Sequence, residues 1–248
     1  MSSKIEWCDE SRSFWRGCFE RSEGCVYCYV KRMMEQEGVD FRTLQFAADE
    51  YCEQPLHWKK SRVIFCNAMS DFFDERAEER RYYVWDIIRR AHWHVWLILT
   101  KRIKSAATML PHDWGRGYEH VWLGVSVENQ RRALERVPFL INQIPAAHKW
   151  LSCEPLLEQV DLRGWLGKGK VEWVSTGGES GLQARFFNPA WAKKIVYQCE
   201  RAGVPVWHKQ NGGNTRINGT WGGDELDGQV YHEAPGWFGE QYKQEGLF

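Results

Sequence analysis

The sequence lacks a long hydrophobic run, a net charge and an internal linker. No stretch among its 248 residues approaches the roughly 20 consecutive apolar residues that span a bilayer, so we expect no membrane attachment. Lysine plus arginine (33) equals aspartate plus glutamate (33), so overall charge does not draw the chain to nucleic acid, although a local basic face would. No internal segment is rich in Pro, Gly or Ser, which favours one domain over two.

The first residues, 1–6, also lack the apolar core of a secretory signal, and we therefore expect a cytoplasmic protein. Its eight cysteines should then be mostly reduced thiols, because the cytoplasm disfavours disulfides. Four of them are scattered without the spacing of metal ligands, which argues against a second cluster: Cys8, Cys52, Cys66 and Cys199.

Three other cysteines, Cys18, Cys25 and Cys28, lie within eleven residues of one another. Such a group in a cytoplasmic chain is typical of a metal or iron–sulfur site. A glycine precedes each of the first two and lets the loop fold back. Three thiolates on a four-iron cluster leave one iron free to hold a small molecule. A zinc site with these cysteines and a distant histidine is the alternative that the spacing leaves open.

Six short apolar runs follow the cysteines, most of them separated by segments of helical length. Each run is apolar at nearly every position, as in parallel strands that are covered on both faces. The runs are residues 62–66, 95–99, 121–125, 149–151, 171–174 and 204–207. We expect helices over residues 29–37, 75–92, 103–109, 131–141 and 189–202.

This pattern predicts an α/β fold, a partial (β/α)6 TIM-type barrel with the cysteine loop over the C-terminal mouth of its strands. The barrel domain would span residues 1–211, with the cysteine loop at 15–29. Residues 212–248 would form a loop or hairpin extension, because they contain the turn pairs Asn218-Gly219 and Asp227-Gly228.

Polar residues follow each apolar run, where parallel strands place their sites. We therefore expect one shared site at the strand ends. Each carboxylate there has the alternative role of partner to a neighbouring Arg or Lys, and Cys153 that of a small buried apolar residue. The candidates are Ser70, Asp71, Lys101, Ser126, Glu128, Asn129, Cys153, Glu154, Glu179 and Lys209.

The chain resembles the radical S-adenosylmethionine (SAM) superfamily and, more closely, a three-cysteine family of phage and prophage genomes, with distant similarity to spore photoproduct lyase. It departs from the superfamily by having six residues, not three, between the first two cysteines. The motifs that carry the resemblance are Gly17-Cys18, Gly24-Cys25-Val26-Tyr27-Cys28-Tyr29, Ser70-Asp71-Phe72-Phe73, Leu99-Thr100-Lys101-Arg102, Gly124-Val125-Ser126-Val127-Glu128-Asn129, Leu151-Ser152-Cys153-Glu154-Pro155-Leu156, Gly177-Gly178-Glu179-Ser180-Gly181 and His208-Lys209-Gln210.

The resemblance implies a 4Fe–4S cluster on the three cysteines, SAM on its open iron, and an electron donor such as flavodoxin or ferredoxin. Reductive cleavage of SAM would give a 5′-deoxyadenosyl radical that abstracts a substrate hydrogen. In this interpretation Tyr27 lies beside the adenine, Ser70 and Asp71 bind the amino group, and Lys101, with Arg102 beside it, binds the carboxylate.

The same interpretation assigns the remaining candidates. Ser126 and Asn129 would meet the ribose, with Glu128 in the same cofactor site. The catalytic candidates would handle the substrate: Glu154 and Glu179 as carboxylates for an amine, Cys153 as a hydrogen-atom donor, and Lys209 as a contact at the mouth.

Phage context, itself part of the resemblance, suggests that the substrate is DNA or a modified nucleotide in the host cytoplasm. We expect a monomeric isomerase or modifying enzyme acting on a hypermodified thymine. A photoproduct-lyase-like repair enzyme and a zinc-stabilised nucleic-acid-binding module without catalysis are the alternatives. Two groups of basic residues would follow a phosphate backbone or simply be solvated: Arg12, Arg16, Arg21, Lys31 and Arg32, and Lys59, Lys60 and Arg62.

Overall fold

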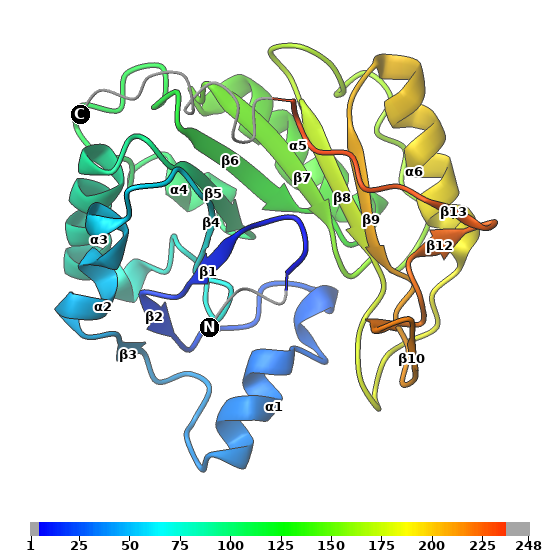
Figure 1. Ribbon diagram of the computed structural model, residues 1–248, viewed down its shortest axis with the longest axis horizontal. Coiled ribbons are helices and arrows are strands. Elements are labelled where there is room, and N and C mark those ends of the chain that lie inside the picture. The colour runs from blue at the N-terminus through cyan, green and yellow to red at the C-terminus, as the bar shows by residue number, and fades with distance from the viewer. Residues whose placement is uncertain (1–4, 237–248) are drawn as a thin grey trace.

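The structure, a computed structural model, describes residues 5–236 and is built around a curled, seven-stranded parallel sheet that forms half a barrel (Figure 1). The strands pair in chain order, β1-β4-β5-β6-β7-β8-β9, and every pair is parallel. They are β1 (Glu10–Arg12), β4 (Val63–Cys66), β5 (Val95–Thr100), β6 (Val121–Ser126), β7 (His148–Cys153), β8 (Trp173–Gly177) and β9 (Val206–Gln210). The α/β prediction is confirmed, and the six apolar runs supply β4 to β9.

The sequence prediction missed β1, which makes the sheet one strand wider than expected. Its three residues, Glu10–Arg12, pair with Ile64 to Cys66 of β4 at the edge of the sheet. These residues are largely polar, because an edge strand is covered less than a central one. Three residues are also too few to show an alternating hydrophobic pattern in the sequence. This strand leads directly into the cysteine loop and so places the loop beside the mouth.

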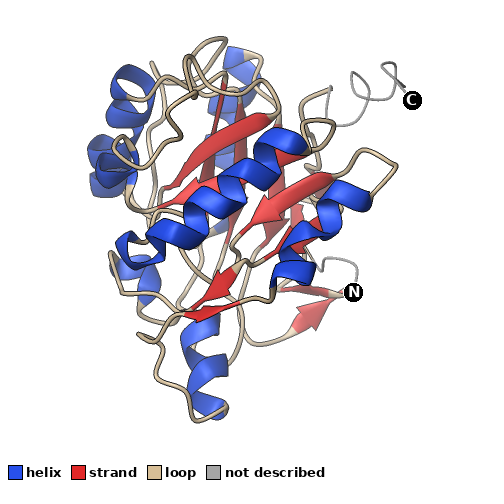
Figure 2. Cartoon of the chain, turned by 90° about the vertical axis from the view of Figure 1, so that its left-hand side faces the viewer, coloured by secondary structure: helices blue, strands red, loops and turns tan. Residues whose placement is uncertain are grey.

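The long helices cover the outer face of the sheet, as Figure 2 shows. The α-helices are α1 (Tyr29–Gln36), α2 (Asp49–Glu53), α3 (Glu78–Arg90), α4 (Ile103–Ala106), α5 (Gln130–Gln143) and α6 (Pro189–Ala202), and three short 3₁₀ helices are η1 (Glu23–Cys25), η2 (Gln54–His57) and η3 (Glu75–Ala77). Helix α6 has the predicted bounds because Asn188 caps its first turn, Pro189 begins it, and Gly203 ends it with a φ of 65°. Helix α4 ends at Ala106, three residues before the predicted end.

Alternate strand residues divide between the two faces of the sheet. One set packs against the helices, and the other turns to the concave face, where five rings form what we call the aromatic plug: Trp7, Phe65, Trp122, Trp150 and Trp173. The Trp7 ring lies 4.9 Å from that of Phe65, and the Trp150 and Trp173 rings stack at 5.2 Å. The plug fills the concave face below the ends of the strands.

Small antiparallel pairs complete the described chain. Strands β2 (Trp15–Arg16) and β3 (Gln45–Phe46) pair beside the cysteine loop. Two hairpins follow β9, formed by β10 (Arg216–Ile217) with β11 (Thr220–Trp221) and by β12 (Glu225–Leu226) with β13 (Gln229–Val230).

Both hairpins turn at the predicted pairs. Asn218 and Asp227 have φ values of 50° and 52°, and a glycine with positive φ follows each of them. The last part of the predicted extension, residues 237–248, lies outside the described residues. Within residues 5–236, no helix combines the length and the apolar character needed to cross a bilayer.

Candidate functional site

A cavity of about 270 Å³ opens at the C-terminal ends of the strands. All three cysteines of the loop line it, together with polar side chains from six strand ends or the loops that follow them. Among the predicted site residues, those that line the cavity are Cys18, Cys25, Tyr27, Cys28, Ser70, Asp71, Lys101, Ser126, Glu154, Glu179 and Lys209. The expectation of a cysteine loop next to a polar mouth therefore agrees with the geometry.

The first cysteine follows a glycine that no other residue could replace without rearrangement. Gly17 has a φ of 98°, and a Cβ atom there would lie 2.2 Å from the carbonyl oxygen of Thr43. Ser70 Oγ donates a hydrogen bond to the Gly17 carbonyl (2.5 Å), and the Cys18 N–H donates to the carbonyl of Phe41 (2.9 Å). Ser70 thus positions the backbone before Cys18.

The long segment between Cys18 and Cys25 reaches across the mouth and docks beyond β6. Ser22 Oγ donates to Glu128 Oε1 (2.5 Å), and Glu23 pairs with Arg132 of α5 (3.0 Å). Gly24 packs directly on the Glu128 side chain, since a Cβ atom there would lie 2.6 Å from Glu128 Cγ. The six residues between Cys18 and Cys25 give the loop the length for this attachment.

Glu128 holds the loop to the sheet from a buried position. Its side chain is 0% exposed, and it pairs with Arg136 (2.8 Å) and with Lys101 (3.6 Å). Burial favours the neutral acid, but the cations Lys101 and Arg136 outweigh it and lower the pKa of Glu128. Glu128 was predicted in the cofactor site, yet it is not among the residues that line the cavity.

Asn129 occupies another position than the one predicted for it. Its side-chain oxygen accepts a hydrogen bond from the Arg132 N–H (2.9 Å) and caps the first turn of α5. Asn129 does not line the cavity, so the predicted ribose contact has no support in the geometry. The neighbouring Ser126 does line it.

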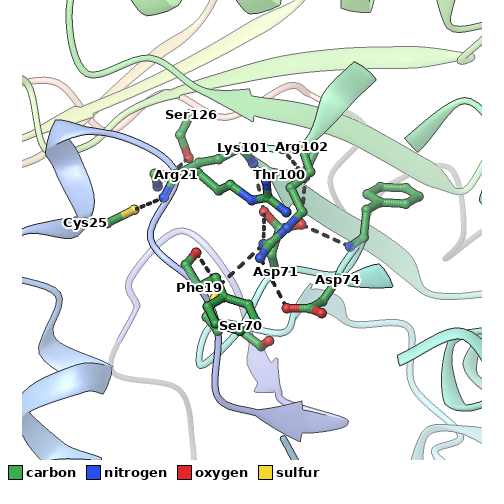
Figure 3. Close-up of polar contacts among 12 residues, drawn as sticks. Phe19, Arg21, Cys25, Ser70, Asp71, Asp74, Thr100, Lys101, Arg102 and Ser126 are labelled. Atoms are coloured by element: carbon green, nitrogen blue, oxygen red, sulfur yellow. Dashed lines mark hydrogen bonds and ion pairs between the residues drawn. The ribbon is translucent and has the colours of Figure 1, made fainter. Parts of the chain in front are cut away.

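Asp71 is surrounded by donors from the end of β5 (Figure 3). Oδ1 accepts from Thr100 Oγ1 (2.7 Å) and the Phe73 N–H (3.0 Å), and Oδ2 accepts from the Lys101 N–H (2.9 Å). Arg102 also lies 3.3 Å from Oδ2. The carboxylate lines the cavity with both oxygens engaged by the protein, and it organises the end of β5.

Arg102, predicted beside Lys101 at the SAM carboxylate, lines the cavity and is also the cation that contacts the first cysteine. Its buried guanidinium donates to Cys18 Sγ (3.4 Å) and pairs with Asp74 (3.2 Å). Burial raises the pKa of the Cys18 thiol, and Arg102 opposes that rise. The acidic partners outweigh burial at Arg102 itself and raise its pKa, so it remains a cation. No sequence spacing links Arg102 to Cys18, since they lie 84 positions apart.

Lys101 brings a second cation to the cysteines. Its ammonium donates to Ser126 Oγ (3.1 Å) and lies 3.6 Å from Glu128. Burial would lower the pKa of Lys101, but the negative charges of Glu128 and of a Cys25 thiolate act against burial and raise it. Lys101 is therefore a stable positive charge in the cavity wall, as its predicted role requires.

Ion pairs line the opposite wall of the cavity. Glu154 accepts from Ser175 Oγ (2.7 Å) and from Lys209 Nζ (3.1 Å). Glu179 forms a bidentate pair with Arg185, whose guanidinium also lies 5.2 Å from the centre of the Tyr27 ring. Both carboxylates thus have cationic partners, which was the alternative role for them.

Cys153 lies away from the cavity, contrary to its predicted catalytic place. Its side chain is 0% exposed and packs in the core between sheet and helices. Burial raises the pKa of its thiol well above the ordinary value. The preceding residue, Ser152, lines the cavity instead, because successive strand residues point to opposite faces.

Protein N–H groups reach two of the three cysteine sulfurs. Arg102 donates to Cys18 Sγ, and the Arg21 N–H donates to Cys25 Sγ (3.5 Å). Such N–H donors stabilise the charge of cluster thiolates.

A family model described as "Protein of unknown function (DUF5131)" matches residues 2–235. No curated protein and no solved structure matches the chain. The matched region contains the cysteine loop, the seven strands and both hairpins, which is most of the 248 residues. The chain therefore belongs to the family of proteins of unknown function DUF5131.

Proposed function

We propose that this protein is a radical SAM enzyme whose half-barrel is an incomplete TIM-type barrel. The observation that carries the proposal is that three thiols from one loop and charged side chains from successive strand ends line the same cavity. Parallel α/β sheets place their active sites at this end. A structural metal site would not need a cavity with so many charged groups.

Cys18, Cys25 and Cys28 would hold a 4Fe–4S cluster. When bound, the cluster and SAM supply one-electron reduction of a sulfonium and thereby a carbon radical. The protein's own part is electrostatic. Arg102 and Lys101 place two positive charges beside the thiolates, and the Arg21 N–H adds a hydrogen bond to Cys25.

SAM would lie along the wall formed by the ends of β4, β5 and β6. The Lys101 ammonium suits the carboxylate of SAM, and the Tyr27 ring lines the cavity where an adenine could stack. Ser70 and Asp71 have protein partners already, so we assign them to positioning Cys18 and Lys101 as well as to the cavity wall.

The substrate would lie against Glu154 and Lys209. This pair lines the cavity and is held by a single contact of 3.1 Å, so an ammonium and an anion of a substrate could each take one partner. A hypermodified thymine in DNA is the substrate class we propose, with a flavodoxin or ferredoxin as electron donor in the cytoplasm. A base would have to leave the duplex to reach the cavity.

The test is anaerobic reconstitution with iron and sulfide, followed by incubation with SAM, a reductant and native phage DNA. We expect about four irons per chain and a brown protein, formation of 5′-deoxyadenosine, and a nucleoside changed in chemical shift or retention but not in mass. A product of split pyrimidine dimers would instead identify a lyase. A colourless protein that retains zinc would contradict the proposal.

Two cysteine variants form a matched pair for this test. Cys28→Ala should lose the cluster absorbance and all cleavage of SAM, because it removes a ligand. Cys153→Ala should retain both, since that thiol is buried on the helix side of β7. Loss of the modified nucleoside in Cys153→Ala, with iron content and 5′-deoxyadenosine formation unchanged, would restore the predicted hydrogen-donor role.

A further inference from the structure

A second group of metal-ligating side chains lies outside the cavity. Glu6, Asp224 and His232 each offer one ligand atom, and these three atoms all lie within 4.8 Å of one another. Glu6 directly precedes Trp7 of the aromatic plug, and the other two belong to the segment after β9. The cysteines take no part in this group.

His232 is held in a defined orientation. Its ring stacks on that of Trp207 of β9 at 4.3 Å and 7°. The backbone on either side pairs with β9, since the His208 N–H donates to the Tyr231 carbonyl (2.7 Å) and the Glu233 N–H donates to that of Val206 (3.0 Å). Figure 1 shows this red segment crossing β9. The backbone bonds fix where the side chain is attached, and turning the imidazole away would break its stacking on Trp207.

One nitrogen of His232 faces both carboxylates. Nε2 lies 3.4 Å from Asp224 Oδ2 and 4.0 Å from Glu6 Oε2, and it is buried without a hydrogen-bond partner. These separations exceed the roughly 2.7–3.2 Å of an N–H···O hydrogen bond. Neighbouring ligands of a tetrahedral ion with bonds of about 2.1 Å would be about 3.4 Å apart. The Asp224 distance matches this ligand spacing, and the Glu6 oxygen, at 4.0 Å, would have to move about 0.6 Å closer to complete the site.

His148 provides the contrast within the same molecule. It also lies between two carboxylates, but Glu172 meets its Nδ1 (3.0 Å) and Glu119 meets its Nε2 (3.6 Å). Carboxylates on opposite ring nitrogens cannot share one ion with the imidazole. Of these two histidines, His232 is the one with both carboxylates on the same ring nitrogen.

We propose that Glu6, Asp224 and His232 bind one divalent transition-metal ion, represented by Zn²⁺, with a fourth position left for water. A neutral imidazole and two carboxylates form a donor set that zinc accepts. The ion would join residue 6 to the segment that covers β9, an edge strand of the sheet. Its role would be structural, because it ties the two ends of the described chain across the open side of the half-barrel.

The test measures Zn²⁺ binding in full-length protein in which Cys18, Cys25 and Cys28 are replaced by serine, so that the thiols do not compete. Affinity is taken from competition with a chromophoric chelator. We expect one Zn²⁺ per chain, an affinity at least tenfold weaker in His232→Gln and in Asp224→Asn, and no change in His148→Gln. Circular dichroism spectra confirm that each variant is folded.

Two outcomes would overturn the proposal. One is the absence of stoichiometric zinc binding in the parent protein, and the other is equal affinity in His232→Gln and the parent. A second measurement covers the case in which His232→Gln does not fold: zinc should raise the thermal midpoint of the parent but not that of Asp224→Asn. None of these readouts depends on SAM chemistry, so the proposed function stands or fails separately.

Discussion

The two halves of the concave face differ although the same strands build both. Toward the strand starts, the buried rings of the aromatic plug pack against one another, and two of them, Trp7 and Phe65, form the floor of the cavity. Toward the strand ends, polar and charged side chains surround a cavity. On β7 the change takes two residues, from Trp150 in the plug to Ser152 in the cavity wall. The plug stabilises the sheet, and the mouth is the half that is free to carry chemistry.

Gly124, in the motif at the end of β6, makes room for a ring of the plug. Gly124 of β6 lies where a Cβ atom would be 2.5 Å from Trp150 Nε1. The absence of a side chain there lets the Trp150 ring lie across the sheet and donate to the Ile98 carbonyl (3.2 Å). The motif that ends in the polar residues Glu128 and Asn129, just after β6, therefore begins with a glycine that makes room for a ring of the plug.

Removing the centre of the plug should have the largest effect. Trp150→Ala is expected to lower the free energy of unfolding by about 3–5 kcal/mol, because it leaves a cavity among packed rings. Urea denaturation measures this change. Tyr197→Ala, at an exposed position of α6, should change stability by less than about 0.5 kcal/mol. A loss below about 1 kcal/mol in Trp150→Ala would show that the plug is not a packed core.

Breaking the buried ion pair between Arg136 and Glu128 should lower the free energy of unfolding by about 3 kcal/mol. Arg136→Met removes the cation 2.8 Å from the buried Glu128 and leaves that carboxylate with Lys101 at 3.6 Å. Since Glu128 also holds Ser22, amide hydrogen exchange in residues 19–28 should speed up.

Arg163→Met, which breaks an exposed pair with Asp161, provides the control and should leave both stability and exchange unchanged. Unchanged exchange in Arg136→Met would mean that Glu128 does not fasten the cysteine loop.

Acid should weaken the end of the sheet opposite the mouth. His94 precedes β5 and is buried with Nδ1 accepting from the Arg62 N–H (3.1 Å) and Nε2 2.9 Å from the Pro55 carbonyl. Burial lowers its pKa from 6.5 to about 4. The unfolded chain then binds the proton more readily than the folded one, so stability present above pH 6.5 is lost as pH falls toward 4.

Protonation of His94 in the unfolded chain should lower the free energy of unfolding by about 2 kcal/mol at pH 5. Most carboxylates titrate below this pH. Denaturant titrations of the native protein and of His94→Asn between pH 7 and pH 5 measure this loss. The variant should have the shallower pH dependence, whatever its stability at pH 7. Equal slopes would mean that folding does not lower the pKa of His94.

Much of the scaffold follows from local patterns. Central strands are covered on both faces, so β4 to β9 were visible as apolar runs, and the hairpin turns were visible as Asn-Gly and Asp-Gly pairs. Edge strand β1 has no such pattern and was missed. The clustering of strand-end residues was also predictable, because parallel strands bring all their C-terminal ends to one side.

The sequence by itself determined the order of the strands, the end of the sheet that carries polar groups, and the three thiols in one loop. Only the tertiary structure decided which polar groups line the cavity and which hold the scaffold. Arg102 meets Cys18 across 84 positions, and Ser22 meets Glu128 across 106. The local pattern of apolar residues shows which positions of an element are buried. The partner of a buried charge depends instead on how the fold brings distant segments together.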